Sequence, residues 1–257
     1  MRTRYRISVN GVHMDSLDSN LAILDVQFSE PKRNDTTQRV ANLPGYTVSD
    51  TYVEDLTVTI TFELHIYNIA DRNAACQKVN AWAANGGTLT TNERPGQYLQ
   101  NVRCVKFANI NSSKNWTDPL TIVFSTTNSP YFRSNQQKTL TLTGKNTSGN
   151  LVLDGNTSES LVSVTATAAQ TVKSIQFTVG STTLKLTGLN IPASKQIIVD
   201  YTGNRILRIR GNGSSIMARL DPSSSDNLLA KCGASTKVSV VSDGKVTAVF
   251  AGRGCWL

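Results

Sequence analysis

The stretch from Leu56 to Tyr67 alternates strictly between apolar and polar residues, and this pattern constrains the fold more than any other in the chain. Side chains of a β-strand point alternately to opposite faces, so one face of this strand is expected to be buried and the other to be polar. The apolar set is Leu56, Val58, Ile60, Phe62, Leu64 and Ile66, and the polar set is Thr57, Thr59, Thr61, Glu63, His65 and Tyr67. The pattern predicts a long strand in a sheet that is packed on one side.

An amphipathic helix of about four turns is predicted directly after this strand. Asn68 is a suitable N-cap, and Asn85-Gly86-Gly87 supplies a stop. Between them, apolar residues recur at helical spacing, at Ala75, Cys76, Val79, Trp82 and Ala83. Strands are expected before the helix, at residues 3–12 and 21–28, and after it, at residues 88–110 and 118–132. Strands followed by one helix and more strands indicate an α+β unit.

The segment between residues 30 and 45 is predicted to be a loop. The run Glu30-Pro31-Lys32-Arg33-Asn34-Asp35 interrupts the strand pattern, because proline and clustered polar residues favour turns. The loop is expected to end at Leu43-Pro44-Gly45.

The character of the chain changes after Phe132. Residues 133–257 read as strands of five to eight residues, separated by turn sequences such as Asp154-Gly155-Asn156 and Asp243-Gly244. Short strands at this spacing favour an antiparallel sandwich or jelly roll. The sequence therefore predicts a mainly β protein with two domains, residues 1–132 and residues 133–257.

The stretch IIVDYTGNRILRIRGNG, residues 197–213, brings glycines and arginines together and could be either an anion site or two consecutive β-turns. A phosphate-binding loop needs a helix after it whose N-terminus receives the anion, and here strands precede and follow. We therefore interpret the stretch as two antiparallel strands around a turn. Gly203 and either Gly211 or Gly213 are expected to have positive φ, and Ile198 or Leu207 to be buried.

The balance of charge gives little support to a specific nucleic-acid-binding function. The formal net charge is +8, but the basic residues are scattered, and no run of five or more Lys or Arg occurs. The basic start of the chain is followed by polar residues rather than by an apolar segment, so we expect no signal peptide and assembly in the cytoplasm. Nothing approaches eighteen consecutive apolar residues, and no membrane insertion is expected.

Catalytic, metal and cofactor sites are not predicted. The two histidines, His13 and His65, lie in a predicted turn and on the polar face of the long strand, and no H-E-x-x-H motif is present. Glu54 and Asp55 are adjacent, and adjacent strand residues point to opposite faces, so they cannot share a substrate as a glycosidase pair does. We expect no catalytic residue, no bound metal and no cofactor.

The four cysteines, Cys76, Cys104, Cys232 and Cys255, are far apart in the sequence and form no C-x-x-C motif. They are expected to be reduced thiols that are mostly buried.

The order of several short motifs along the whole chain is similar to that of a known family. In the first half these are VNGV, the LPG of Leu43-Pro44-Gly45, EDLTVTITFELHIY, VNAWAANGG, GQYLQNVRCVKFANI and PLTIVFSTTNSPYF. In the second half they are IIVDYTGNRILRIRGNG, Leu228-Leu229, the strands around Asp243-Gly244 and the terminal Trp256. In this order the chain resembles the distal tail protein family of long-tailed, siphovirus-type bacteriophages.

The resemblance implies an N-terminal belt domain, a β-sheet or split barrel with one helix, that closes into a hexameric ring around the tail channel. It also implies a C-terminal galectin-like β-sandwich that projects outward. The expected function is that of a structural hub in the virion, which joins the tail tube protein to the tail-tip hub or baseplate without catalysis. The alternative is a carbohydrate-binding module that contacts a saccharide of the host surface through the C-terminal sandwich.

Physical chemistry supplies a reason for a ring. A strand with a polar second face can offer its edges and that face to neighbouring subunits, and a head-to-tail contact that closes on itself forms a ring. The residues expected at the subunit interface or the channel are Leu43, Pro44, Gly45, Thr57, Thr59, Thr61 and His65. The loop of residues 30–50 is expected to be the arm that reaches the next subunit. A monomer with the polar face in water fits the strand pattern equally well.

Overall fold

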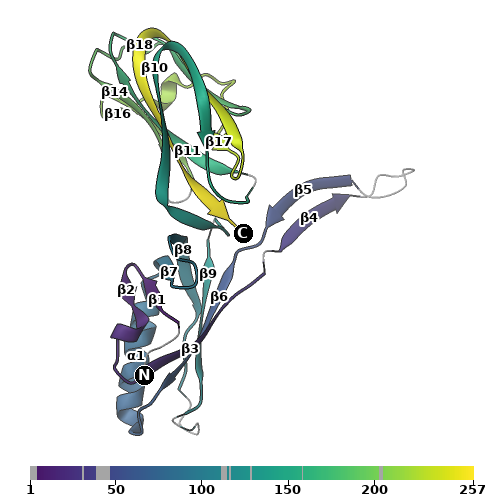
Figure 1. Ribbon diagram of the computed structural model, residues 1–257, viewed down its shortest axis with the longest axis vertical. Helices are drawn as coiled ribbons and strands as arrows, with labels where there is room; N and C mark the ends of the chain where they lie inside the picture. The colour runs from purple at the N-terminus through teal and green to yellow at the C-terminus, as the bar shows by residue number, and fades with distance from the viewer. Residues whose placement is uncertain are drawn as a thin grey trace. The chain divides into compact units, whose positions relative to one another are not determined.

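The computed structural model describes residues 5–30, 32–38, 47–110, 115, 117–127, 129–157, 159–202 and 205–257. The chain divides into two compact units, residues 1–132 and residues 133–257 (Figure 1). The described residues are mainly β-strand with one α-helix, which confirms the predicted fold class.

The first unit is built on an antiparallel sheet in the order β3-β6-β9-β8-β7-β1-β2. Its strands are β1 (Ile7–Val9), β2 (Val12–His13), β3 (Leu21–Phe28), β6 (Thr57–Leu64), β7 (Gly87–Thr91), β8 (Gln97–Lys106) and β9 (Leu120–Thr126), with a 3-10 turn η1 (Met14–Ser16) after β2. The strict alternation of β6 is confirmed, because Val58, Ile60, Phe62 and Leu64 are fully buried while the intervening residues are half-buried. The strand ends at Leu64, three residues earlier than the alternation predicts.

Helix α1 (Ile69–Ala84) packs against β6 and β8, on the face of the sheet that carries the apolar side chains. It begins as predicted, since Asn68 Oδ1 accepts a hydrogen bond from the backbone N–H of Ala70 at 2.8 Å. The predicted apolar residues of the helix are all buried. Trp82 makes an edge-to-face contact with Phe124 of β9, at 5.8 Å between ring centroids, and its Nε1 donates to the Val12 carbonyl at 2.9 Å. These contacts fix the helix to both β9 and the first hairpin.

The segment predicted as a loop contains two strands, so that prediction is wrong in part. β4 (Arg33–Gln38) and β5 (Thr47–Val53) pair with each other as a separate antiparallel sheet. Figure 1 shows them as a two-stranded ribbon that follows β3 and leads into β6. The polar residues that suggested a loop are compatible with a two-stranded ribbon, because such a ribbon has little apolar surface to bury.

The second unit consists of antiparallel strands arranged like a sandwich. They are β10 (Phe132–Val152), β11 (Ser160–Ala168), β12 (Ile175–Val179), β13 (Thr182–Leu186), β14 (Gln196–Tyr201), β15 (Leu207–Gly211), β16 (Ser214–Ser215), β17 (Leu229–Ala230) and β18 (Ser235–Trp256), with a 3-10 turn η2 (Met217–Arg219). β10 and β18 are far longer than the strands of five to eight residues that the turn sequences predict.

β18 is long because it takes part in both layers of the sandwich. Residues 238–242 pair with β12, and residues 246–252 pair with β11. The strand passes from one layer to the other at Asp243-Gly244, which is therefore a bend within one strand and not a turn between two. Phe177 of β12 meets Phe250 of β18 edge to face, at 6.2 Å between ring centroids, so side chains of the two layers form one core.

The stretch of residues 197–213 forms two antiparallel strands as predicted, with Ile197, Val199 and Ile209 buried. The expectation that Ile198 or Leu207 is buried is wrong, because the register places the neighbouring residues inward. Gly213 has the predicted positive φ, 86°, whereas Gly211 does not, and Gly203 lies outside the described residues.

The bend of β18 requires a residue without a side chain. A Cβ at Gly244 would lie 2.7 Å from the Thr171 carbonyl oxygen and 3.2 Å from Val172 Cγ2. The free energy of unfolding of the Gly244→Val variant is therefore expected to be about 1–3 kcal/mol lower than that of the wild type, which is the usual cost of overpacking. Urea unfolding measures this loss, with Val241→Thr on the exposed side of the same strand as a control that changes stability by less than about 0.5 kcal/mol. An equal effect of the two substitutions would show that the bend tolerates a side chain.

Candidate functional site

The polar face of the first sheet is the candidate functional surface of residues 1–132. The registers align three rows of side chains across β3, β6, β9 and β8 on the side of the sheet opposite α1. The residues are Thr57, Ser125 and Arg103 in the first row, Gln27, Thr59, Val123 and Lys106 in the second, and Asp25, Thr61 and Thr121 in the third. We call this surface the threonine face.

Thr57, Thr59 and Thr61, which were predicted as interface or channel residues, are brought together on this face and are half-buried. His65 follows the end of β6, and its Nε2 lies 3.3 Å from the Glu63 carboxylate. The other predicted residues, Leu43, Pro44 and Gly45, lie outside the described residues.

The prediction that the strand of Thr57–Leu64 offers its edges to neighbours is wrong. β6 is hydrogen-bonded to β3 on one side and to β9 on the other, so only its polar face is available. Within the part of the chain that the structure describes, β3 pairs with β6 alone and forms the edge of the sheet. A bulge at Leu24 interrupts this edge strand, and the Leu24 side chain is 42% exposed. The alternation of apolar and polar residues shows that a segment is a strand but not which strands are its neighbours in the sheet. The sequence therefore did not show that β3, and not β6, is an edge strand.

Charges of opposite sign lie at the two sides of the threonine face. Asp25 of β3 and Glu63 of β6 supply negative charge at one side, and the exposed Arg103 and Lys106 of β8 supply positive charge at the other. A surface with this polarity is complementary to the opposite side of a second copy.

The base of the β4–β5 hairpin is held by Glu54, which follows β5. Glu54 Oε1 lies 3.3 Å from Lys32 Nζ and accepts a hydrogen bond from Asn34 Nδ2, and its backbone N–H donates to the Lys32 carbonyl at 2.8 Å. The hydrogen bond from Asn34 and the nearby Lys32 hold the pKa of Glu54 below its ordinary value. The ionised Glu54 carboxylate therefore links the segment before β4 to the segment after β5 at the base of the hairpin.

The second unit carries an open cavity of about 550 Å³. It lies between the segments of residues 205–207 and 217–227, and it is lined by Arg205, Ile206, Leu207, Met217, Leu220, Asp221, Pro222, Ser224, Ser225, Asp226 and Asn227. The lining combines apolar side chains with hydroxyl, carboxylate and amide groups.

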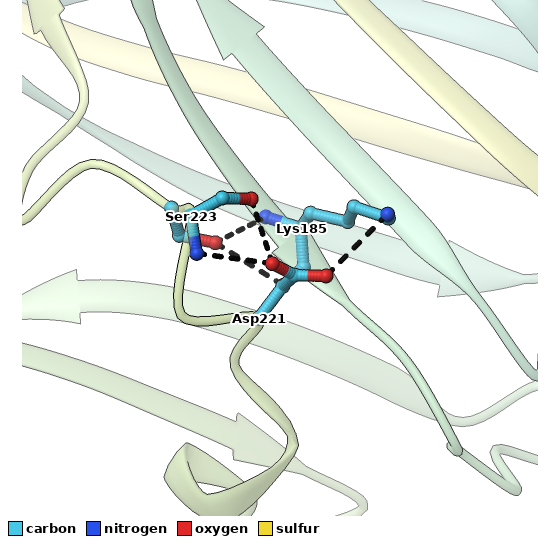
Figure 2. A network of polar contacts seen from close by, with 4 residues as sticks. Lys185, Asp221 and Ser223 are labelled. Carbon is cyan, nitrogen blue, oxygen red and sulfur yellow. Dashed lines mark hydrogen bonds and ion pairs between the residues drawn. The ribbon is translucent and has the colours of Figure 1, made fainter.

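Figure 2 shows a network of polar contacts around Asp221, which is one of the residues that line this cavity. Asp221 Oδ1 accepts hydrogen bonds from the Ser223 hydroxyl at 2.7 Å and the Ser223 backbone N–H at 3.0 Å, while Lys185 Nζ lies 3.4 Å from Asp221 Oδ2. The bonds from Ser223 lower the pKa of Asp221. A carboxylate that stays ionised near neutral pH stabilises its turn and is poorly suited to act as a general acid.

Two of the three arginines of residues 197–213, Arg208 and Arg210, are bound to a carboxylate of the neighbouring strand. Asp200 Oδ1 lies 2.9 Å from Arg208 Nε, and Asp200 Oδ2 lies 2.6 Å from Arg210 NH2. These are charge-assisted hydrogen bonds within the β14–β15 pair. The two arginines therefore stabilise the hairpin, in line with its interpretation as a scaffold and not as an anion site.

In the described part of the chain, no cluster of three or more His, Cys, Asp or Glu side chains is arranged to hold a metal ion. Nor does any described helix combine the length and apolarity needed to cross a membrane.

The fold of a one-sided sheet with its helix, followed by a β-sandwich, is shared with a solved phage protein. The Dit protein (gp 19.1) of phage SPP1, described as a paradigm of the hub adsorption apparatus in phages that infect Gram-positive hosts, matches with a TM-score of 0.73 and 14% identity. The match covers 97% of this chain and 98% of the SPP1 protein. At this level of identity the match shows a shared fold, which confirms the fold expected from the motif order.

A structure of the phage p2 baseplate in its activated conformation with Sr matches less well, with a TM-score of 0.49 and 10% identity over 97% of both chains. No protein-family model matches the chain, and neither does any curated protein.

Without the Asp200 carboxylate, Arg208 and Arg210 are expected to bind anions from solution. The Asp200→Asn variant should therefore elute from a heparin column at a higher salt concentration than the wild type. The control is Asp226→Asn, which makes the same change in net charge at an exposed carboxylate that forms no ion pair with Arg208 or Arg210. Equal shifts for the two variants would show that net charge alone, and not release of the arginines, sets the binding.

Acid is expected to loosen the base of the β4–β5 hairpin. The pKa of Glu54 is lower in the folded state than in the unfolded state. The stability that Glu54 gives to the hairpin base is therefore present above the unfolded-state pKa of about 4.3, and it is lost as the pH falls through the lower folded-state pKa. NMR amide shifts of residues 33–38 are expected to change in acid for the wild type. In Glu54→Gln they should already be changed at neutral pH, whereas the exposed Glu30→Gln control should behave as the wild type. Identical spectra of Glu54→Gln and wild type at neutral pH would contradict this role.

Proposed function

We propose that this protein is a structural, ring-forming hub of a phage tail, which joins the tail tube to the tail tip or baseplate without catalysis. The observation that carries the proposal is the fold shared with SPP1 Dit over nearly the whole of both chains. Fold alone does not define function, so the surfaces of this chain must also suit the role.

The threonine face supports this role. In the first unit, α1 covers the apolar face of the sheet, and the opposite face presents hydroxyl groups with acidic residues at one side and basic residues at the other. A contact between the acidic side of one copy and the basic side of the next uses two different surfaces and repeats around a ring. In this proposal residues 1–132 form a homohexameric belt, with Thr57, Thr59, Thr61 and His65 at the interface or the channel.

In the same proposal residues 133–257 are a galectin-like sandwich that projects outward. The partners of the ring are the tail tube protein on one side and the tail-tip hub on the other. The protein is then assembled in the host cytoplasm and resides in the tail tip of the virion. A hub of this kind acts by holding partners in register, which requires rigid strands and complementary surfaces rather than titratable groups.

The carbohydrate-binding alternative would use the cavity of the second unit. Sugar sites commonly present an aromatic ring as a platform, and the residues that line this cavity include no Phe, Tyr or Trp. The structural hub is therefore the function that we favour. Binding of the purified chain to a glycan array, abolished by Asp226→Ala in the cavity, would favour the alternative instead.

Ring formation is expected to depend on the threonine face. Size-exclusion chromatography with light scattering should give a hexamer for the wild type, and Thr59→Arg should give smaller species, because it places a bulky charge at the centre of the face. The control is Thr187→Arg on an exposed loop of the second unit, which is expected to leave the hexamer intact. A wild-type chain that stays monomeric at about 100 µM, a concentration at which a contact of micromolar affinity is nearly saturated, would argue against the ring.

A further inference from the structure

Cys232 and Cys255 lie together near the two ends of β18. Cys232 precedes the strand and Cys255 is its penultimate residue, and the bend at Gly244 returns the chain between them. Cys232 forms a parallel β-bridge with Leu153, and Cys255 forms a parallel β-bridge with Gly155. Two cysteines that are distant in the sequence therefore border the same three-residue segment.

Glycines allow these segments to come close to one another. A Cβ at Gly155 would lie 2.0 Å from the Cys255 carbonyl oxygen, and a Cβ at Gly233 would lie 2.6 Å from the Gly155 carbonyl oxygen. Backbone hydrogen bonds hold this approach, from Gly233 N–H to the Leu153 carbonyl at 2.7 Å and from Asn156 N–H to the Cys255 carbonyl at 3.0 Å. The close approach is therefore built into the backbone at this end of the sandwich.

The two thiols are buried, and they are close enough for each to shift the pKa of the other. The interaction with Cys255 lowers the pKa of Cys232, and the same interaction together with burial raises the pKa of Cys255. The Cys255 sulfur also lies 3.6 Å from Ser160 Oγ. Cys232 is the more exposed of the pair, at 8% against 3%. The asymmetry makes Cys232 the nucleophile of the pair.

We propose that Cys232 and Cys255, which are free thiols in the structure, form an intramolecular disulfide on oxidation, and that this disulfide ties together the two ends of β18. The cross-link is independent of the proposed hub function, since it concerns the second unit alone. The disulfide would link the two ends of β18, the strand that takes part in both layers, so neither end could detach from the sandwich without the other. Cross-linking of residues that are distant in the sequence also restricts the unfolded chain, which stabilises the folded state.

The oxidant that the reaction needs is a small-molecule disulfide. The Cys232 thiolate attacks one sulfur of this molecule, whose S–S bond breaks, and the departing thiolate takes up a proton. Cys255 then loses its proton, and its sulfur attacks the Cys232 sulfur of the mixed disulfide and expels the second small thiol. The protein loses two protons and two electrons, and the small disulfide is reduced to two thiols.

The experiment uses the reduced full-length chain incubated with oxidised glutathione, then denatured, alkylated with iodoacetamide and digested with trypsin. Cleavage after Lys231, Lys237 and Arg253 releases CGASTK, residues 232–237, and GCWL, residues 254–257. Mass spectrometry is expected to find these two peptides joined by a disulfide, with only Cys76 and Cys104 alkylated. The thermal midpoint of the oxidised protein is expected to rise by several degrees.

Two variants make the test specific. Cys76→Ser is expected to retain the cross-link, whereas Cys255→Ser is expected to keep glutathione on Cys232 and to show no disulfide-dependent rise in the thermal midpoint. Four alkylated cysteines in the oxidised wild type, a stable glutathione adduct on wild-type Cys232, or a cross-link that involves Cys76 or Cys104 would each overturn the proposal.

Discussion

The first unit depends on the burial of one face of β6 against α1. Fully buried Val58, Ile60, Phe62 and Leu64 form the centre of this core, and the contact of Trp82 with Phe124 joins the helix to the next strand. A sheet that is packed on one side leaves its other side to water or to a partner. The threonine face exists because the apolar face is occupied, and the proposed ring rests on this asymmetry.

The second unit solves a different problem, since its two layers must bury both of their inner faces. β18 contributes to both layers, and the Phe177–Phe250 contact joins them into one core. The continuity of this strand also explains the position of Cys232 and Cys255, because a strand that bends back between two layers brings its own ends together. The contacts of Asp221 with Ser223 and Lys185, and those of Asp200 with Arg208 and Arg210, stabilise a local turn and a hairpin.

Much of the fold could be predicted where the signal is local. The alternation of residues 56–64 gave the buried face of β6, and Asn68 with Asn85-Gly86-Gly87 bounded α1, because side-chain periodicity and capping depend on neighbouring residues. The hairpin of β4 and β5 was missed because its polar residues resemble a loop. Asp243-Gly244 was interpreted as a turn because the same residue types serve at a bend within one strand, and only pairing partners distinguish the two.

The sequence by itself determined the mainly β fold class, the single helix and the sidedness of β6, since these follow from the pattern of apolar residues along the chain. Only the tertiary structure decided which strand forms the edge of the first sheet, which face of it gathers charges of opposite sign, and which cysteines meet. Those features depend on the order and register of strands that are distant in the sequence. Register is set by the packing of whole faces against each other, which no local pattern specifies.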